Sequence, residues 1–133
     1  MLKTYHGGCH CGRVRFRAEI DLDASRIGEC NCSICTKKGF LHIPVARERL
    51  DILSGADALT TYTFNTGTAK HLFCRHCGMH PFYHPRTDPD NYSVNARCLD
   101  DYDPATMAPR RRFDGRHWED AFARAHADWT AAR

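Results

Sequence analysis

The chain has 133 residues, of which 42% are hydrophobic and 26% are charged, and its formal net charge is +3 at pH 7. This length predicts a single domain over residues 1–133, and the composition is ordinary for a globular protein. No apolar run is long enough to cross a bilayer, and the first residues lack the apolar segment of a signal peptide. We therefore expect a cytoplasmic protein without a membrane span.

Strand signals occupy most of the chain. Charged and apolar residues alternate over residues 13–20, which predicts a strand with four inward-facing side chains: Val14, Phe16, Ala18 and Ile20. Shorter apolar runs predict further strands at 50–53, 60–64, 71–73, 82–83 and 92–95. The sequence Thr-Gly-Thr at 66–68 indicates a tight connection between two of them. Prolines punctuate the second half and disfavour long helices there.

The last segment differs from the rest. Its apolar residues recur at helical spacing and predict a helix over about 115–132: Trp118, Phe122, Ala125 and Trp129. Acidic residues at 119 and 120 would lie in the first turn, where they favour the helix dipole. We expect this helix to dock on the sheet or to form a contact between two copies of the chain.

Seven of the eight cysteines fall into three groups: Cys9 and Cys11; Cys30, Cys32 and Cys35; Cys74 and Cys77. In a reducing compartment such close spacings indicate metal binding rather than disulfides. Seven thiolates that hold two zinc ions would also cancel the positive surplus of the chain, so net charge gives little support for a nucleic-acid partner.

Spacing leaves two ways of sharing the metal open. Zinc prefers four tetrahedral ligands, and a site with three protein ligands keeps a position for water or substrate. In one arrangement the two cysteine pairs form a complete site, and the triplet holds a second, open zinc. In the other, Cys32 and Cys35 join Cys74 and Cys77 as a zinc ribbon, and the remaining three cysteines are left over.

Other residues near the motifs are weaker candidates. Lys37 and Lys38 follow the triplet and would suit a substrate carboxylate, although two exposed lysines on a turn are the simpler interpretation. Three histidines are candidates for a proton relay or a fourth ligand: His42, His80 and His84. The eighth cysteine, Cys98, is expected to be a small buried side chain.

Four segments carry a resemblance to a known family: GGCHCGRVRF, CNCSICTKKG, FCRHCGMHPFYHPRTDPDNYSVNARCLDD and FDGRHWE. They are similar to the motifs of the glutathione-dependent formaldehyde-activating enzyme family, also called the CENP-V/GFA family, over about residues 5–120. The resemblance is nearer to the centromere protein V-like branch. It implies a mainly β, zinc-binding β-tent fold with a C-terminal α-helix. It also implies a structural zinc at Cys9, Cys11, Cys74 and Cys77 and a second, open zinc at Cys30, Cys32 and Cys35.

The resemblance further implies a zinc-dependent carbon–sulfur lyase. Its substrate would be S-hydroxymethylglutathione, the adduct of glutathione and formaldehyde, or a related thiol–aldehyde adduct. A zinc held by three thiolates is thiophilic, so a substrate thiolate is a natural fourth ligand. The alternative is a non-catalytic zinc module that binds protein or nucleic acid, as the centromere protein V branch suggests. The basic run Arg110-Arg111-Arg112 is expected to be a solvated loop, which makes nucleic acid a weak candidate.

Overall fold

The computed structural model describes the backbone of residues 1–129 and the side chains of residues 1–124, and it is built mainly of β-strands. One sheet has the antiparallel order β1-β2-β5, formed by Lys3–Gly8, Arg15–Ile20 and Leu50–Ser54. A five-stranded sheet has the order β10-β3-β4-β9-β8, formed by Arg111–Phe113, Gly28–Cys30, His42–Val45, Tyr92–Asn95 and Phe82–Tyr83. The hairpin β6-β7, formed by Leu59–Tyr62 and His71–Cys74, is a separate two-stranded sheet.

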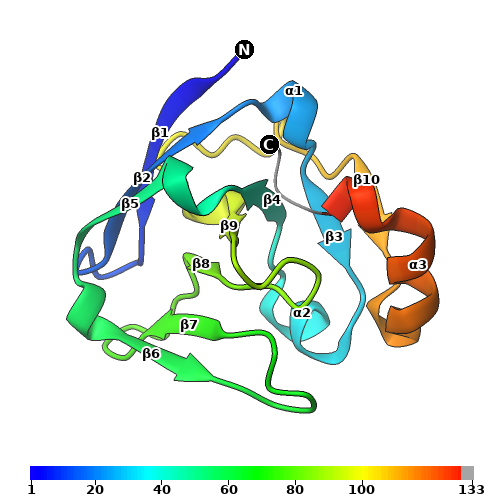
Figure 1. The fold of residues 1–133 in the computed structure, drawn as a ribbon. Coiled ribbons are helices and arrows are strands. Elements are labelled where there is room, and N and C mark those ends of the chain that lie inside the picture. Colours follow the sequence, from blue (N-terminus) through cyan, green and yellow to red (C-terminus); the bar gives the residue numbers. More distant parts are fainter. Residues whose placement is uncertain (130–133) are drawn as a thin grey trace.

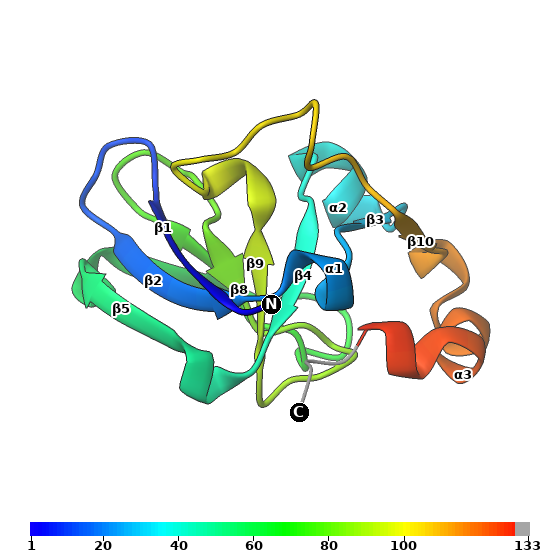
Figure 2. The same ribbon diagram turned by 90° about the horizontal axis from the view of Figure 1, so that it is seen from above.

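Helices are few and short. They are α1 (Leu22–Ser25), α2 (Ser33–Lys38) and α3 (Trp118–Trp129). Four 3-10 helices connect the strands, at Arg47–Arg49, Ala56–Ala58, Ala96–Cys98 and Gly115–His117. In Figures 1 and 2 the β1-β2-β5 sheet and α3 lie at opposite ends of the molecule, with β4, β8 and β9 between them. No helix among the described residues is long and apolar enough to cross a membrane.

The two larger sheets share one core. Phe16 of β2 meets Phe82 of β8 edge to face, with ring centroids 5.5 Å apart, and neither side chain is exposed to solvent. The alternation predicted for residues 13–20 is confirmed from Arg15 onward, since Phe16, Ala18 and Ile20 are buried while the residues between them are not. Val14 is also buried, but it lies in a bend that precedes the strand. The mainly β fold expected from the sequence is confirmed.

The hairpin signal at residues 66–68 is also confirmed. Strands β6 and β7 pair antiparallel, and Gly67 adopts a φ of 71°, in the left-handed region that glycine tolerates best. The loop that connects these strands extends away from the rest of the hairpin (Figure 1), and its residue Phe64 lines the same cavity as the cysteine triplet. The turn that the sequence predicts therefore belongs to a loop that forms part of the cavity wall.

The expected solvated loop at residues 110–112 is wrong for two of its three residues. Arg111 and Arg112 belong to β10, which pairs in parallel with β3. The Arg111 Nε donates to the backbone oxygen of Arg26 at 2.6 Å, and Arg112 forms an ion pair with Glu29 at 2.7 Å. Arg111 and Arg112 thus each have a partner within the fold, although the Arg112 side chain remains exposed.

The C-terminal helix is confirmed, and its α-helical part begins at Trp118 rather than at about residue 115. A 3-10 helix at Gly115–His117 leads into α3, where Trp118 stacks on Phe122 with ring centroids 4.7 Å apart. These rings pack with the buried Ala121 against Phe113 of β10, so the helix docks on the edge of the five-stranded sheet. The prediction also included the side chains of Ala125 and Trp129 and the residues 130–132, which lie outside the described part.

Candidate metal centres

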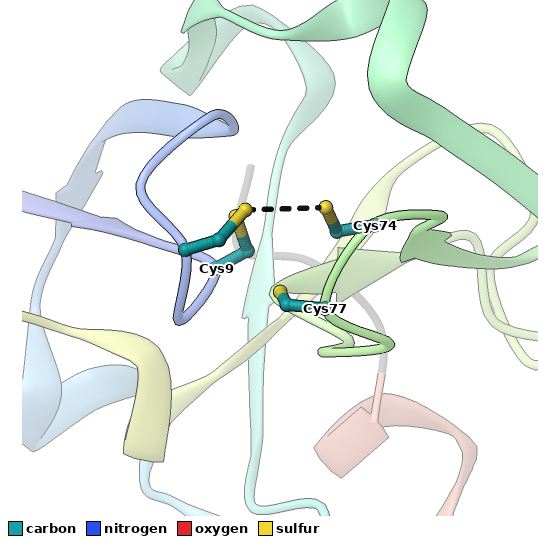
Figure 3. Close-up of side chains that lie close together, drawn as sticks. Cys9, Cys74 and Cys77 are labelled. Carbon is teal, nitrogen blue, oxygen red and sulfur yellow. Dashed lines mark hydrogen bonds between the residues drawn. The ribbon is translucent and has the colours of Figure 1, made fainter.

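The first cysteine cluster joins two distant parts of the chain. Cys9 and Cys11 lie in the loop after β1, whereas Cys74 ends β7 and Cys77 lies in the turn that follows it. Figure 3 shows Cys9 approaching from one side and Cys74 and Cys77 from the other. The turn is closed by the Gly78 N–H, which donates to the Cys74 oxygen at 2.7 Å with Gly78 at a φ of 77°.

The sulfur spacing in this cluster fits a tetrahedral metal. The Cys11 Sγ lies 3.6 Å from the Cys9 Sγ and 3.7 Å from the Cys74 Sγ. A disulfide would require about 2.05 Å, whereas zinc–sulfur bonds of about 2.3 Å give a tetrahedral edge of about 3.8 Å. The backbone and guanidinium of Arg13 hydrogen-bond to Cys11 and lower its pKa to about 6, which favours the thiolate that metal binding needs.

The second cluster is assembled around the short helix α2. Cys30 ends β3, Cys32 caps the helix, and Cys35 is buried in its first turns. The Cys32 Sγ accepts a hydrogen bond from the Cys35 N–H at 3.4 Å. Hydrogen bonds with the thiols of Cys30 and Cys35 lower the pKa of Cys32 to about 2. Hydrogen bonds with Cys30 and Cys32 raise the pKa of Cys35. The three sulfurs are therefore close enough to share hydrogen bonds and to shift one another's pKa.

The two clusters differ in completeness. The ligand atoms of Cys9, Cys11, Cys74 and Cys77 all lie within 4.8 Å of one another, as do those of Cys30, Cys32 and Cys35. No fourth cysteine, histidine or carboxylate among the described residues joins the triplet within that limit. The structure thus groups the seven cysteines as the first arrangement requires, and the zinc-ribbon grouping is wrong.

A cavity of about 420 Å³ opens directly onto the triplet, and all three of its cysteines contribute to the wall. Much of the remaining wall is aromatic, from Phe64, His71, Tyr83, Tyr92, Phe113 and Trp118. Three further lining residues contact one another: the guanidinium of Arg86 lies 3.7 Å from the centroid of the Trp118 ring and reaches Glu119 at 3.4 Å. The triplet is therefore both short of a protein ligand and accessible to a molecule much larger than water.

The two lysines after the triplet have different environments. Lys37 is exposed, as expected. The same expectation is wrong for Lys38, which is half-buried, with its Nζ 3.3 Å from the Nδ1 of His71. That Nζ also lies 5.0 Å from the ring centroid of Phe40 and 5.1 Å from that of Tyr83. Burial lowers the pKa of Lys38, while the nearby cysteines oppose this shift.

None of the three candidate histidines belongs to the ligand group of the triplet. His42 lines the cavity, but its Nδ1 contacts the Ser93 hydroxyl at 3.1 Å and the Tyr83 hydroxyl at 3.2 Å. Burial lowers the pKa of His42 to about 3, so its imidazole is neutral at pH 7. His84 is engaged with the backbone oxygen of Asn91 at 2.8 Å, and His80 does not line the cavity.

Two residues outside the cysteine clusters, Cys98 and His71, differ in their relation to the cavity. Cys98 is partly buried against the backbone oxygen of His80, and burial raises its pKa to about 12, as suits an inert small side chain. His71, by contrast, lines the cavity beside the triplet, although sequence reasoning assigned it only to a strand. No motif marks it, because its place depends on the pairing of β6 with β7.

The fold and the two clusters define a small, mainly β protein with two potential thiolate metal centres, one of them open to a cavity. The family model for glutathione-dependent formaldehyde-activating enzymes matches residues 4–117, and the chain belongs to this family. The crystal structure of a protein from Rhodobacter sphaeroides has the same fold, with a TM-score of 0.73 and 34% sequence identity. The similarity covers 80% of this chain and 98% of that one.

Proposed function

We propose that the chain binds two zinc ions and that the triplet centre makes or breaks the carbon–sulfur bond of a thiol–aldehyde adduct. Cys9, Cys11, Cys74 and Cys77 would hold a structural zinc, and Cys30, Cys32 and Cys35 would hold a second zinc. The observation that carries the proposal is the triplet's lack of a fourth protein ligand at the wall of a cavity of about 420 Å³. A purely structural site would gain nothing from either feature.

Zinc bound at the triplet would supply a thiophilic Lewis acid that lowers the pKa of a substrate thiol. The family name points to glutathione as the thiol and formaldehyde as the aldehyde. In the forward direction the thiolate sulfur adds to the carbonyl carbon, and the carbon–sulfur bond forms. The π pair of the carbonyl moves to the oxygen, which takes the proton that the thiol lost. The reverse reaction returns thiol and aldehyde, and neither direction needs an oxidant.

The residues around the triplet support this chemistry in separate ways. The aromatic wall lowers the polarity around the triplet, which would strengthen electrostatic contacts with a bound molecule. Arg86, which lines the cavity and is held above Trp118, would offer its guanidinium to a carboxylate of the thiol. Lys37 is exposed and follows the triplet by two residues, so it is a weaker candidate for the same role. His42 and His71 contribute neutral imidazoles rather than charges, because burial lowers both of their pKa values.

The proposal is tested by titrating glutathione into the cobalt-substituted protein and following the thiolate-to-metal absorption bands. We expect a saturable change that S-methylglutathione does not produce and that Cys35→Ser abolishes. Cys98→Ser is the matched control, since it removes a cysteine outside both clusters and should leave the titration intact. No change at millimolar glutathione would contradict the proposal and favour the non-catalytic zinc module.

A further inference from the structure

The contact between Lys38 and His71 restricts the imidazole to one tautomer. The Lys38 Nζ lies 3.3 Å from the His71 Nδ1, and a lysine ammonium donates hydrogen bonds but accepts none. The Nδ1 must therefore be the acceptor. A neutral imidazole has one donor and one acceptor nitrogen, so its hydrogen resides on Nε2.

His71 is held in a neutral state and a fixed orientation. Its ring stacks on Tyr83, with centroids 4.9 Å apart and planes at 12°, and on Phe64, with centroids 5.5 Å apart and planes at 25°. The side chain is only 3% exposed. Burial, and then the charge of Lys38, lower the pKa of His71 to about 4. Both faces of the ring and one of its nitrogens are thus occupied.

The remaining nitrogen is available to a ligand. His71 lines the same cavity as Cys30, Cys32 and Cys35. No side chain or backbone group in the described part of the chain accepts a hydrogen bond from its Nε2, and Nε2 is not among the fully enclosed polar atoms. A neutral N–H donor without a protein partner therefore belongs to a residue that lines the cavity in which a molecule bound at the triplet would lie.

We propose that the Nε2–H of His71 donates a hydrogen bond to the oxygen of a thiol–aldehyde adduct, and that Lys38 is the positioning residue that fixes this tautomer. The oxygen would be the hydroxyl of the adduct or the alkoxide that forms as the thiol adds to the carbonyl. A neutral donor that is already oriented stabilises such an oxygen without reorganising. The identity of the ligand rests on the proposed function, whereas the tautomer of His71 does not.

The tautomer is tested by long-range proton–nitrogen NMR spectra of the zinc-loaded protein labelled with ¹⁵N-histidine. We expect His71 to be protonated on Nε2 in the wild type and to lose this preference in Lys38→Met. Lys37→Met removes the neighbouring exposed lysine and should leave the His71 signals unchanged. A wild-type hydrogen on Nδ1, or a tautomer that Lys38→Met does not alter, would overturn the positioning role.

The contact with the ligand is tested by titrating the cobalt-substituted protein with glutathione alone and with glutathione preincubated with formaldehyde. His71→Phe keeps the aromatic stack and removes the donor, so we expect it to weaken binding of the adduct by roughly 3- to 10-fold, the worth of one net hydrogen bond. Its affinity for glutathione alone should stay within about twofold of the wild type by the same reasoning. His71→Gln, which restores an N–H donor, should recover part of the preference for the adduct.

The outcomes separate the two proposals. Equal affinities of His71→Phe and the wild type for the adduct would overturn the role of His71 while leaving thiol binding at the triplet in place. Equal weakening for both ligands would overturn it as well, because it would indicate general damage to the cavity. Failure of the wild type to bind either ligand would contradict the proposed function and remove the adduct as the partner of His71.

Discussion

Gly115 is the residue whose substitution most directly tests the packing of the triplet. It lies in the 3-10 helix before α3, in a backbone conformation that alanine also adopts. A Cβ at this position would stand 2.6 Å from the Cys30 Sγ and 2.7 Å from the Cys32 Cβ. The perturbation in Gly115→Ala is therefore steric and acts on two of the three proposed ligands.

The magnitude follows from the overlap. Ordinary contacts at such a Cβ begin at 3.4 Å, so either the sulfur or the backbone must move by about 0.8 Å. One extra methyl group in a well-packed region costs about 1–3 kcal/mol. If that cost falls on the cysteines, metal affinity at the triplet drops by about 5- to 140-fold, since 1.4 kcal/mol corresponds to a factor of ten.

Competition between the protein and a chromophoric zinc chelator measures this effect. We expect the weaker of two zinc equivalents to shift by that factor, while the four-cysteine cluster, which Gly115 does not contact, serves as an internal control. Unchanged affinity at both sites would refute the reasoning, because it would mean that the segment before α3 yields without disturbing the sulfurs.

Three further predictions concern stability. Cys74→Ser should unfold or aggregate the protein, because a structural zinc contributes about 10–16 kcal/mol of binding free energy to a fold worth only about 5–15 kcal/mol. Cys35→Ser should lose one metal by elemental analysis but keep most of the fold by circular dichroism. Similar melting temperatures for the two variants would contradict the assignment of the structural role to the four-cysteine cluster alone. Burial lowers the pKa of His42 from 6.5 to about 3. The unfolded chain therefore binds a proton that the folded chain excludes, so the free energy of unfolding should be constant above pH 6.5 with respect to His42 and fall as the pH drops below it. Urea titrations with excess zinc should show a shallower decline in His42→Gln, and equal slopes would contradict the assignment. Phe16→Ala removes the contact with the ring of Phe82, whose centroid is 5.5 Å away. It should lower the free energy of unfolding by about 3–5 kcal/mol in the same assay. A loss below about 1 kcal/mol would show that the two sheets do not share a core.

Local sequence patterns predicted those elements of the fold whose structure depends on residues close together in the chain. The period-two alternation around Phe16 and the turn at Gly67 each reflect the geometry of a few successive residues, so the sequence predicted both. Strand β10 has only three residues and pairs with β3, which lies more than eighty residues earlier. No local pattern encodes such a partner, so the basic run that contains β10 looked like a loop.

In the candidate site, too, the features that depend on local sequence could be predicted, and those that depend on tertiary packing could not. Cysteine spacing identified all seven candidate ligands, but spacing alone left two groupings open, and the choice between them depended on the resemblance to the family. Lys37 and Lys38 look equivalent in sequence, yet successive residues of a helix point about 100° apart. One of them therefore reaches solvent and the other reaches His71. Which lysine faces inward depends on how the fold places α2 relative to His71, and that placement is a tertiary feature that no local pattern predicts.

The parallel pairing of β10 with β3 also sets an order of events during synthesis. The chain leaves the ribosome from its N-terminus, so Cys30 and its two neighbours appear well before Gly115 and Trp118, which wall them in. The separation between the paired strands is 83 residues, and at about 5–20 residues per second their meeting is delayed by roughly 4 to 17 seconds. The four-cysteine cluster is complete as soon as Cys77 emerges. The triplet thus spends seconds as three uncovered thiols on a nascent chain, and metal supply in that interval competes directly with oxidation.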